Sequence, residues 1–281
     1  MNDIIMDTLM DGLKLIPFLF IAFLIIEVLE HKMNKKNKKM ISDSGKVGPL
    51  IGGILGVFPQ CGFSVLATNL YVTRIITLGT LIAVYLSTSD EMLPILLSEN
   101  VPISTIIEIL GLKLCLGIFY GFIIDFIFRK KIRDEKPDYD ICEEEHCHCK
   151  KDGIFKSAIF HTINILMFIM IISFLLNLGM EYLGEEVLSK IFMKDSFFGP
   201  FIASLIGLIP NCGASVMLTE LYIHGAINLG SSLAGLLTSS GVGILVLFKQ
   251  NKNMKENLMI LGIIYGLGVI SGIVIELIGL L

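Results

Sequence analysis

Long apolar stretches recur along this chain, and they constrain its fold more than any other feature. Each spans roughly 20 residues or more, which is the length that an α-helix needs to cross a hydrocarbon layer about 30 Å thick. The stretches are 11–30, 75–98, 103–128, 155–179, 226–248 and 257–281. Only 17% of the chain is charged, against about 25% in soluble domains. The sequence therefore predicts an all-α polytopic membrane protein whose main partner is the lipid bilayer.

The first residues do not have the pattern of a cleavable signal peptide, because Asp3, Asp7 and Asp11 stand where a basic region is required. We therefore expect the first apolar stretch to be retained. Most of the six cysteines lie in two motifs and a polar linker, which is unlike a secreted disulfide framework. Cys115 stands alone in an apolar stretch, where a cysteine usually acts as a small hydrophobic residue.

The two halves of the chain match each other at a constant offset. Between residues 48–89 and 199–240, 18 of 42 aligned pairs are identical without a gap. The frame Pro-x-Cys-Gly-x-Ser occurs in both halves, at 59–64 and at 210–215. We interpret the chain as a tandem duplication. It would consist of a first transmembrane repeat (1–130), a linker (131–153) and a second transmembrane repeat (154–281).

Loop charges indicate that the two repeats have opposite orientations. Loop 31–46 holds six lysines, whereas its equivalent at 180–196 is rich in Glu and Asp. Loop 249–256 holds three lysines, and its equivalent at 98–102 holds no basic residue. Because basic loops remain in the cytoplasm, the bias predicts inverted-topology repeats, which are typical of secondary transporters. The N-terminus is then outside the cell membrane and the central linker is cytoplasmic.

Some segments are too short to cross. Residues 48–59 reach about 18 Å as a helix, roughly half the apolar layer. We favour a re-entrant hairpin, in which 48–59 enters and 63–73 returns, followed by a crossing at 75–98 that is broken at 87–94. Five separate short crossings in each half remain an alternative. Irregular backbone at membrane depth is tolerated only where it is buried in protein or lines a cavity.

The hairpin tips, Gln60-Cys61 and Asn211-Cys212, are expected to converge near the midplane and to bind substrate. The candidate substrate-binding residues are Gln60, Cys61, Ser64, Asn69, Asp90, Glu91, Asn211, Cys212, Ser215 and Glu220. Cys61, Cys212, Asp90 and Glu91 are also candidate metal ligands, because thiolates favour soft ions and carboxylates hard ones. Alternatively, the cysteines are small buried residues, and Asp90 and Glu91 mark a water-exposed helix end.

The linker contains a second candidate metal site. Within "CEEEHCHCKKD", the potential ligands are Cys142, His146, Cys147, His148 and Cys149. Short tracts rich in Cys and His are typical of metal binding, although this spacing is not that of a zinc finger. We expect a cytoplasmic capture site for the transported ion. The alternative is a charged tether.

Other charged residues in apolar stretches receive structural interpretations. Glu108 and Lys113 are expected to pair within 103–128 and stabilise packing. Asp125 and Glu276 occupy equivalent positions near the ends of apolar stretches, where we expect them to be interfacial.

The paired segments "GPLIGGILGVFPQCGFS" and "GPFIASLIGLIPNCGAS", the "STSDE" break at 87–91 and the linker resemble a known family. This is the family of ten-span heavy-metal exporters, whose members are also called arsenic efflux permeases or manganese transporters. The resemblance covers nearly the whole chain. It implies ten membrane segments, counting short ones, and export of a metal or metalloid, but it supplies no assignment of site residues.

The leading hypothesis is a secondary transporter that exports Mn²⁺, another heavy-metal ion or a metalloid by alternating access. We expect no enzymatic activity, no prosthetic group and no nucleic-acid partner, and we leave a homodimer open. The chain has no P-loop fingerprint, so an ion gradient or a separate ATPase subunit would supply the energy. An ion channel, an organic-anion transporter and a membrane thiol oxidoreductase remain alternatives.

Overall fold

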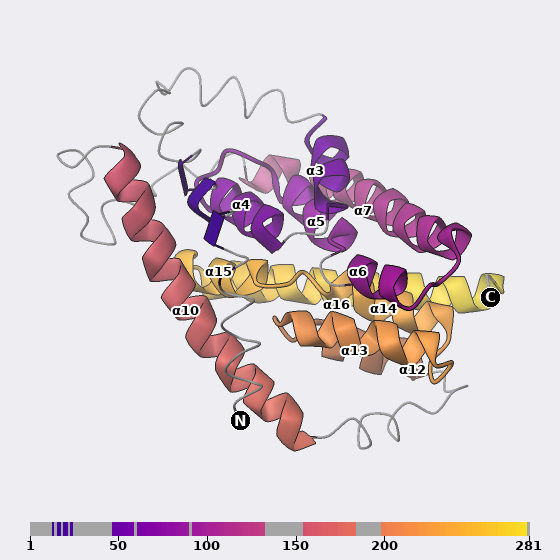
Figure 1. Cartoon of the computed structure of the whole chain (residues 1–281). Coiled ribbons are helices and arrows are strands. Elements are labelled where there is room, and N and C mark those ends of the chain that lie inside the picture. Colours follow the sequence, from indigo (N-terminus) through magenta and orange to yellow (C-terminus); the bar gives the residue numbers. More distant parts are fainter. Residues whose placement is uncertain are drawn as a thin grey trace.

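A computed structural model describes residues 47–58, 61–89, 92–132, 154–183 and 198–279, together with a few helical residues between 13 and 24. Every regular element in these ranges is a helix (Figure 1). Four helical stretches of the described chain are long and apolar enough to cross a membrane, namely Leu78–Ser98, Ile103–Phe128, Leu229–Gln250 and Met254–Ile278. The prediction of an all-α, multi-pass membrane protein is confirmed.

The helices repeat along the chain as the sequence match predicts. The first set is α3 (Gly48–Gly56), α4 (Cys61–Val72), α5 (Leu78–Ser87), α6 (Met92–Ser98) and α7 (Ile103–Ile132). The second set is α12 (Gly199–Gly207), α13 (Cys212–Ile223), α14 (Leu229–Thr238), α15 (Gly243–Gln250) and α16 (Met254–Ile278). Each helix of the second set begins 151 positions after its counterpart in the first, so each stretch of sequence adopts the same local structure twice.

Glycines allow α7 to pack closely and antiparallel against α5. A Cβ built on Gly121 would lie 2.7 Å from the carbonyl oxygen of Gly79, near the start of α5. Nearer the end of α5, a Cβ on Gly117 would lie 3.0 Å from the Ala83 carbonyl oxygen. The same contact recurs in the second set, where a Cβ on Gly272 would lie 2.7 Å from the Gly230 oxygen. Small residues at such interfaces let helix backbones approach within a membrane.

The short helix α3 runs parallel to α5. A Cβ on Gly52 would lie 3.0 Å from the Thr80 carbonyl oxygen, and one on Gly56 would lie 2.7 Å from that of Val84. α3 therefore ends beside the end of α5. Because the chain must then reach the start of α5 at Leu78, α4 runs back along α3 and α5. In the second set, α12, α13 and α14 make the same pairwise contacts as α3, α4 and α5 do in the first.

Two acids near the ends of α7 and α16 cap the helices beside them. The Asp125 carboxylate accepts hydrogen bonds from Gly79 N (2.8 Å) and Thr77 Oγ1 (2.7 Å) at the start of α5. Its equivalent, Glu276, accepts one from Ser231 Oγ (3.0 Å) at the start of α14. Helix N-termini carry unpaired N–H groups and a partial positive charge, which a carboxylate stabilises. These acids therefore have a defined structural role.

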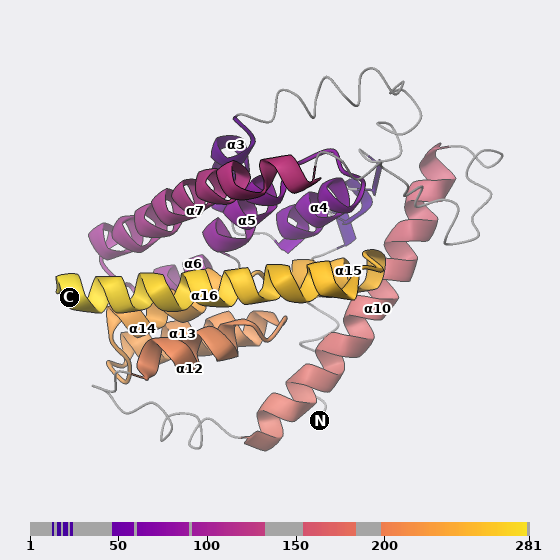
Figure 2. The same ribbon diagram turned by 180° about the vertical axis from the view of Figure 1, so that it is seen from behind.

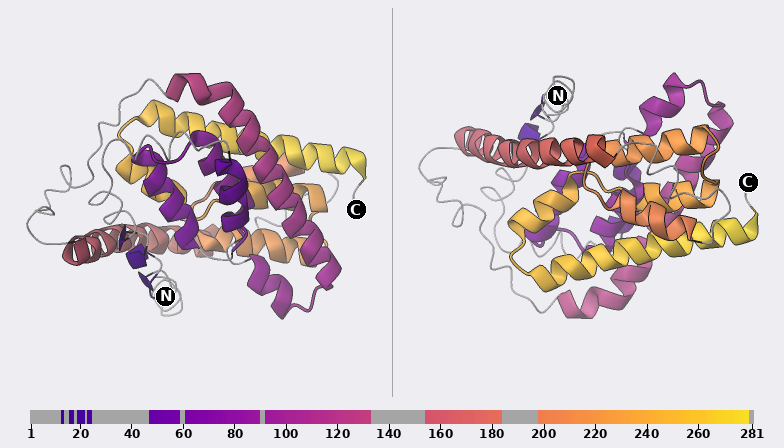
Figure 3. Two further views of the ribbon diagram at one scale, coloured as in Figure 1. Left: turned by 90° about the horizontal axis from the view of Figure 1, so that it is seen from above. Right: turned by 90° about the horizontal axis from the view of Figure 1, so that it is seen from below.

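The two sets of helices interlock. The second set's α15 packs against α4 of the first set, and α6 of the first set packs against α13 of the second. The long helices α7 and α16 lie on the same side of the molecule (Figure 2) and cross each other (Figure 3). They meet where Ser271 Oγ donates to Tyr120 Oη at 3.0 Å, and these two positions are 151 apart. Equivalent positions of the two sets of helices are therefore in direct contact here.

The remaining helix, α10 (Ile154–Leu183), lies along one side of the bundle (Figure 3). Its Ala158, Ile165 and Ile169 belong to a buried apolar cluster with Val65 of α4 and Val246 of α15. Lys249 at the end of α15 donates to the Asn164 carbonyl oxygen at 3.2 Å. The predicted apolar stretch 155–179 thus forms one helix that packs on the junction of α4 and α15.

We expect Gly121→Ala to lower the melting temperature of the purified protein in detergent. The new methyl group would lie 2.7 Å from the Gly79 oxygen and 2.9 Å from the Cβ of Ala83, and such overpacking costs about 1–3 kcal/mol. Gly111→Ala is the matched control, because a Cβ there meets nothing within 4 Å while the gain in helix propensity is the same. Equal melting temperatures for the two variants would contradict the packing.

Candidate functional site

The first helix break follows α5, where hydroxyl side chains compete with backbone N–H groups for the helical carbonyls. Ser87 Oγ donates to the Ala83 carbonyl oxygen and Thr88 Oγ1 to that of Val84, each at 2.7 Å. Thr88 itself leaves the helical conformation, with ψ of 130°. Serine and threonine that bond to carbonyls one turn back weaken a helix. The run of hydroxyl residues therefore ends α5 within the apolar stretch.

The second break follows α14 at the equivalent place but uses different residues. Ser240 N donates to the Thr238 carbonyl oxygen at 2.9 Å, so it does not continue the helical ladder to Leu236. Gly241 then takes a positive φ of 58°, a conformation that glycine adopts at little cost. The carbonyl of Leu236 is left without its helical partner and needs another donor.

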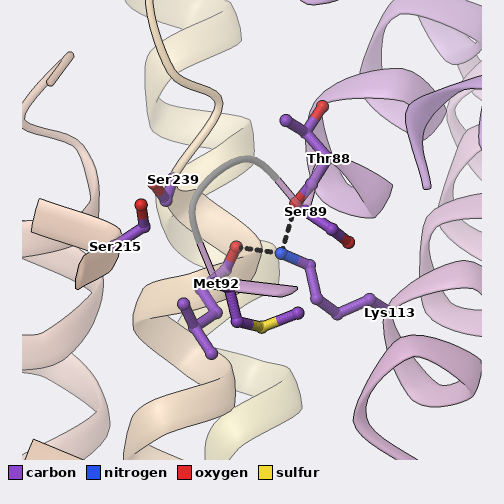
Figure 4. A pocket seen from close by; sticks show the side chains of 7 residues that line it. Thr88, Ser89, Met92, Lys113, Ser215 and Ser239 are labelled. Carbon is purple, nitrogen blue, oxygen red and sulfur yellow. Dashed lines mark hydrogen bonds between the residues drawn. The ribbon is translucent and has the colours of Figure 1, made fainter. Parts of the chain in front are cut away.

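Lys113 of α7 supplies that donor and connects the two breaks. Its side chain is 1% exposed, and its Nζ donates to the carbonyl oxygens of Thr88 and of Leu236, the latter at 2.8 Å. Figure 4 shows the ammonium group between these two carbonyls, with Ser215 and Ser239 on the far side. The lining residues are Thr88, Ser89, Met92, Lys113, Ser215, Leu236 and Ser239. They leave no space for a water molecule.

The position suits a positive charge for an electrostatic reason. The C-terminal end of a helix carries a partial negative charge from its unpaired carbonyls, and α5 and α14 both end at this place. The hydroxyl groups of Ser89, Ser215 and Ser239 add further oxygen atoms. The arrangement is a cation site made of main-chain and hydroxyl oxygens from both sets of helices, and a lysine ammonium occupies it.

The sequence analysis missed Lys113 as a site residue and was wrong about its partner. Glu108 is exposed and Lys113 is buried on another face of α7, so the expected pair does not form. Five positions along a helix turn through about 140°, which separates the two side chains. A signal was present, since Lys113 is the only basic residue in the apolar run 103–128, and an ionisable residue in such a run is a functional candidate.

Three of the predicted tip residues lie at the start of α13, and one of them reaches the site. Asn211 is the N-cap of this helix, and its Oδ1 accepts from Gly213 N at 3.4 Å. Cys212 is partly buried and packs against the cluster that contains Val242. Ser215, one turn later, lines the Lys113 site, and its Oγ donates to the Cys212 carbonyl oxygen at 2.8 Å.

The start of α4, which is equivalent to the start of α13, lies against the second break, between α14 and α15. Ser64 is fully buried, and a Cβ on Gly243, the first residue of α15, would lie 2.9 Å from the Ser64 Cβ. Thr68 Oγ1 lies 3.2 Å from the Gly243 carbonyl oxygen, to which it donates, and 2.5 Å from Tyr85 Oη. Cys61 begins α4, but its side chain lies outside the described residues. Each described tip helix thus packs on the broken helix of the other repeat.

Asn69 and Glu220 occupy equivalent positions further along α4 and α13, and neither lines the Lys113 site. Asn69 is fully buried, and both its amide oxygen and its amide nitrogen lack a hydrogen-bond partner. Glu220 is partly exposed. The other candidates, Gln60, Asp90, Glu91 and the linker residues Cys142, His146, Cys147, His148 and Cys149, lie outside the described residues. Within the described part of the chain, no three His, Cys, Asp or Glu side chains form a metal cluster.

A separate ion pair joins the two sets of helices away from the site. Arg74, which follows α4, binds Glu256 in the first turn of α16 through two hydrogen bonds of 2.8 and 3.0 Å. Tyr71 Oη also donates to Glu256. Burial disfavours the charged guanidinium, but the hydrogen bonds and charge of Glu256 outweigh this effect and raise the pKa of Arg74. The pair therefore remains ionised and fixes the end of α4 to α16.

These features define a polytopic helical membrane protein with a buried polar site where two broken helices meet. The family model described as "Putative, 10TM heavy-metal exporter" matches residues 1–182 and 152–280, and the chain belongs to this family. The family expected from the sequence is confirmed. Comparison with curated proteins and with solved structures found no match.

We expect Glu256→Gln to destabilise the protein by about 2 kcal/mol. This value lies between the contribution of an exposed ion pair and that of a fully buried one, because the Arg74 and Glu256 side chains are 20% and 10% exposed. The measurement is the melting temperature in detergent. Lys255→Gln alters an exposed charge next to Glu256 and is expected to have no effect. A Glu256→Gln variant as stable as wild type would show that this pair does not hold α4 to α16.

Proposed function

We propose that this protein is a secondary transporter that exports a heavy-metal ion by alternating access, and that the ion binds where the breaks after α5 and α14 meet. One observation carries the proposal: carbonyls at the ends of two broken helices, one from each repeat, converge on a single buried cation. In membrane transporters, unwound backbone and half-helix C-termini coordinate cations in this manner.

The chemistry of the site favours a hard or borderline divalent ion. The described lining offers carbonyl and hydroxyl oxygens together with the Met92 thioether, and oxygen ligands suit ions such as Mn²⁺. Asp90 and Glu91 follow Ser89 directly in the sequence, and we propose them as the charged ligands. A softer ion or a trivalent metalloid would depend more on Cys61 and Cys212. We therefore place Mn²⁺ first among the substrates.

Alternating access requires two units that can move around a fixed site. The equal helix sets, the contact of Tyr120 with Ser271, and the reciprocal packing of α4 on α15 and of α6 on α13 support two related repeats. The loop charges support their inverted orientation. The parallel run of α3 beside α5, with α4 returning, supports the re-entrant hairpin. The linker with Cys142, Cys147 and Cys149 would capture the ion in the cytoplasm.

Lys113 also favours a second candidate, transport of an anion. A buried ammonium with hydroxyl neighbours can bind a carboxylate or an oxyanion, and the start of α13, close to Ser215, would contribute N–H groups. Under this hypothesis Lys113 binds the substrate directly and its removal abolishes binding. Under the cation hypothesis the substrate needs the oxygen atoms and not the lysine.

Uptake into inside-out membrane vesicles tests the proposed function. Mn²⁺, Zn²⁺, Fe²⁺, Co²⁺ and arsenite are offered separately under an imposed proton gradient. We expect Mn²⁺ uptake, because export from the cell becomes uptake in this orientation. Asp90→Asn/Glu91→Gln is expected to lower it at least about tenfold, since one lost ligand pair is worth more than 1.4 kcal/mol.

Cys61→Ser/Cys212→Ser separates the two ligand classes. We expect this variant to retain most Mn²⁺ uptake, and to lose uptake of arsenite if arsenite is a substrate. Ser98→Ala, at an exposed position of α6, is the control. If no metal ion is taken up while an organic anion competes for uptake, the anion hypothesis replaces the proposal.

A further inference from the structure

Lys113 is surrounded by the atoms that would bind a free cation. Its Nζ donates to the Thr88 and Leu236 carbonyls, which come from different repeats. These oxygen atoms can only accept, so a donor or a cation must satisfy them in every closed state of the protein. A buried carbonyl without a partner costs about 1–3 kcal/mol. In the closed site, the lysine performs the task that a bound metal ion would otherwise perform.

The two halves of the chain differ at the position of this lysine. The position equivalent to Lys113 in α16 is Ile264, which is fully buried. The second break has no lysine of its own, because the Leu236 carbonyl that is freed there receives its donor from Lys113 of the first repeat. One buried charge therefore serves both breaks, and it stands where the two repeats meet.

We infer that Lys113 is a tethered cation that occupies the ion site when no metal is bound, and that the transported ion displaces it. This inference rests on the proposed function and adds how metal binding is coupled to the reorientation of the protein. With metal present, the ion satisfies the freed carbonyls and the ammonium withdraws. After release, the ammonium returns and lets the unloaded protein close and reorient. Without the lysine, closing would depend on a bound ion, so the protein would exchange metal across the membrane without net export.

Purified variants in detergent provide the first test. Lys113→Met removes the charge and the donors, and Lys113→Gln keeps an N–H₂ donor without the charge. In buffer free of divalent ions we expect both to melt below wild type. Addition of Mn²⁺ should raise the melting temperature of both variants more than that of wild type. Mn²⁺ affinity should increase at least about tenfold, because an internal competitor for the site is gone.

Proteoliposomes provide the second test. Net Mn²⁺ efflux should fall at least about tenfold in both variants, whereas exchange of radioactive Mn²⁺ against unlabelled Mn²⁺ should continue at the wild-type rate. Lys249→Met is the matched control. Lys249 is also a partly buried lysine that donates to a main-chain carbonyl, that of Asn164, and we expect its variant to keep net efflux.

Each outcome decides for or against the tethered cation. Unchanged or weaker Mn²⁺ binding in both folded variants, or equal loss of exchange and net efflux, overturns it. If neither variant can be recovered folded in any of Mn²⁺, Na⁺ or methylammonium, Lys113 is a structural residue and the inference is wrong. If wild type transports no metal, the proposed function fails, but stabilisation of Lys113→Met by an added cation would still support the tethered cation.

Discussion

Where helices break inside the apolar layer, some backbone carbonyls lose their helical hydrogen bonds. The rest of the structure depends on how these carbonyls find another partner. No water reaches them in hydrocarbon, so each needs a donor from the protein or a bound ion. The protein places the ends of α5 and α14 together and brings one ammonium group to both, through Thr88 and Leu236. This need links the two repeats, because the Leu236 carbonyl at the second break receives its donor from Lys113 of the first repeat.

The same scaffold carries two chemically different halves. Helix starts, glycine contacts and capping acids recur at an offset of 151, whereas the residues at the centre do not. Lys113 corresponds to Ile264, Asp90 to Gly241, and Asn69 to Glu220. Packing positions are held equal because both halves must bury the same backbone. Polar positions can differ without disturbing this packing, and a single proposed site, shared by the two halves, does not require them to be equal.

Much of the fold could be predicted from the sequence, because its signals are local. The length of the apolar stretches predicted a membrane protein. The match of the two halves predicted that paired helices begin at corresponding residues, as they do. Pro59, Pro210 and the hydroxyl-rich break marked where helices end. Ser215 lines the Lys113 site, whereas Asn69 and Glu220 do not, and the role of all three in substrate binding stays a prediction. Gln60, Asp90, Glu91 and the linker residues stay predictions.

The partner of each tip could not be predicted, because it is a contact between distant segments. Symmetry predicts that Cys61 and Cys212 meet each other, and this stays a prediction because the Cys61 side chain lies outside the described residues. In the structure, the tip helix α13 packs on α6 and α4 packs on α15, so a tip of one repeat faces a break of the other. Lys113 was misassigned for a related reason. Its nearest charge in the sequence is Glu108, but the carbonyls that it binds belong to residues 25 and 123 positions away.

The packing also limits which parts can move during transport. Contacts of α3 and α7 with α5 leave no room for another atom, since a Cβ on Gly56 or Gly121 would lie 2.7 Å from a carbonyl oxygen of α5. Sliding these helices past one another would cause clashes, so α3, α5 and α7 form one rigid unit, and α12, α14 and α16 form the other. Apolar packing joins the units, since one buried cluster contains residues of both, and so do two sets of polar contacts, the Lys113 bonds and the Arg74–Glu256 pair. Polar contacts can be exchanged for others without loss of packing, and in the proposed transport cycle the Lys113 bonds are the contacts that the metal ion replaces.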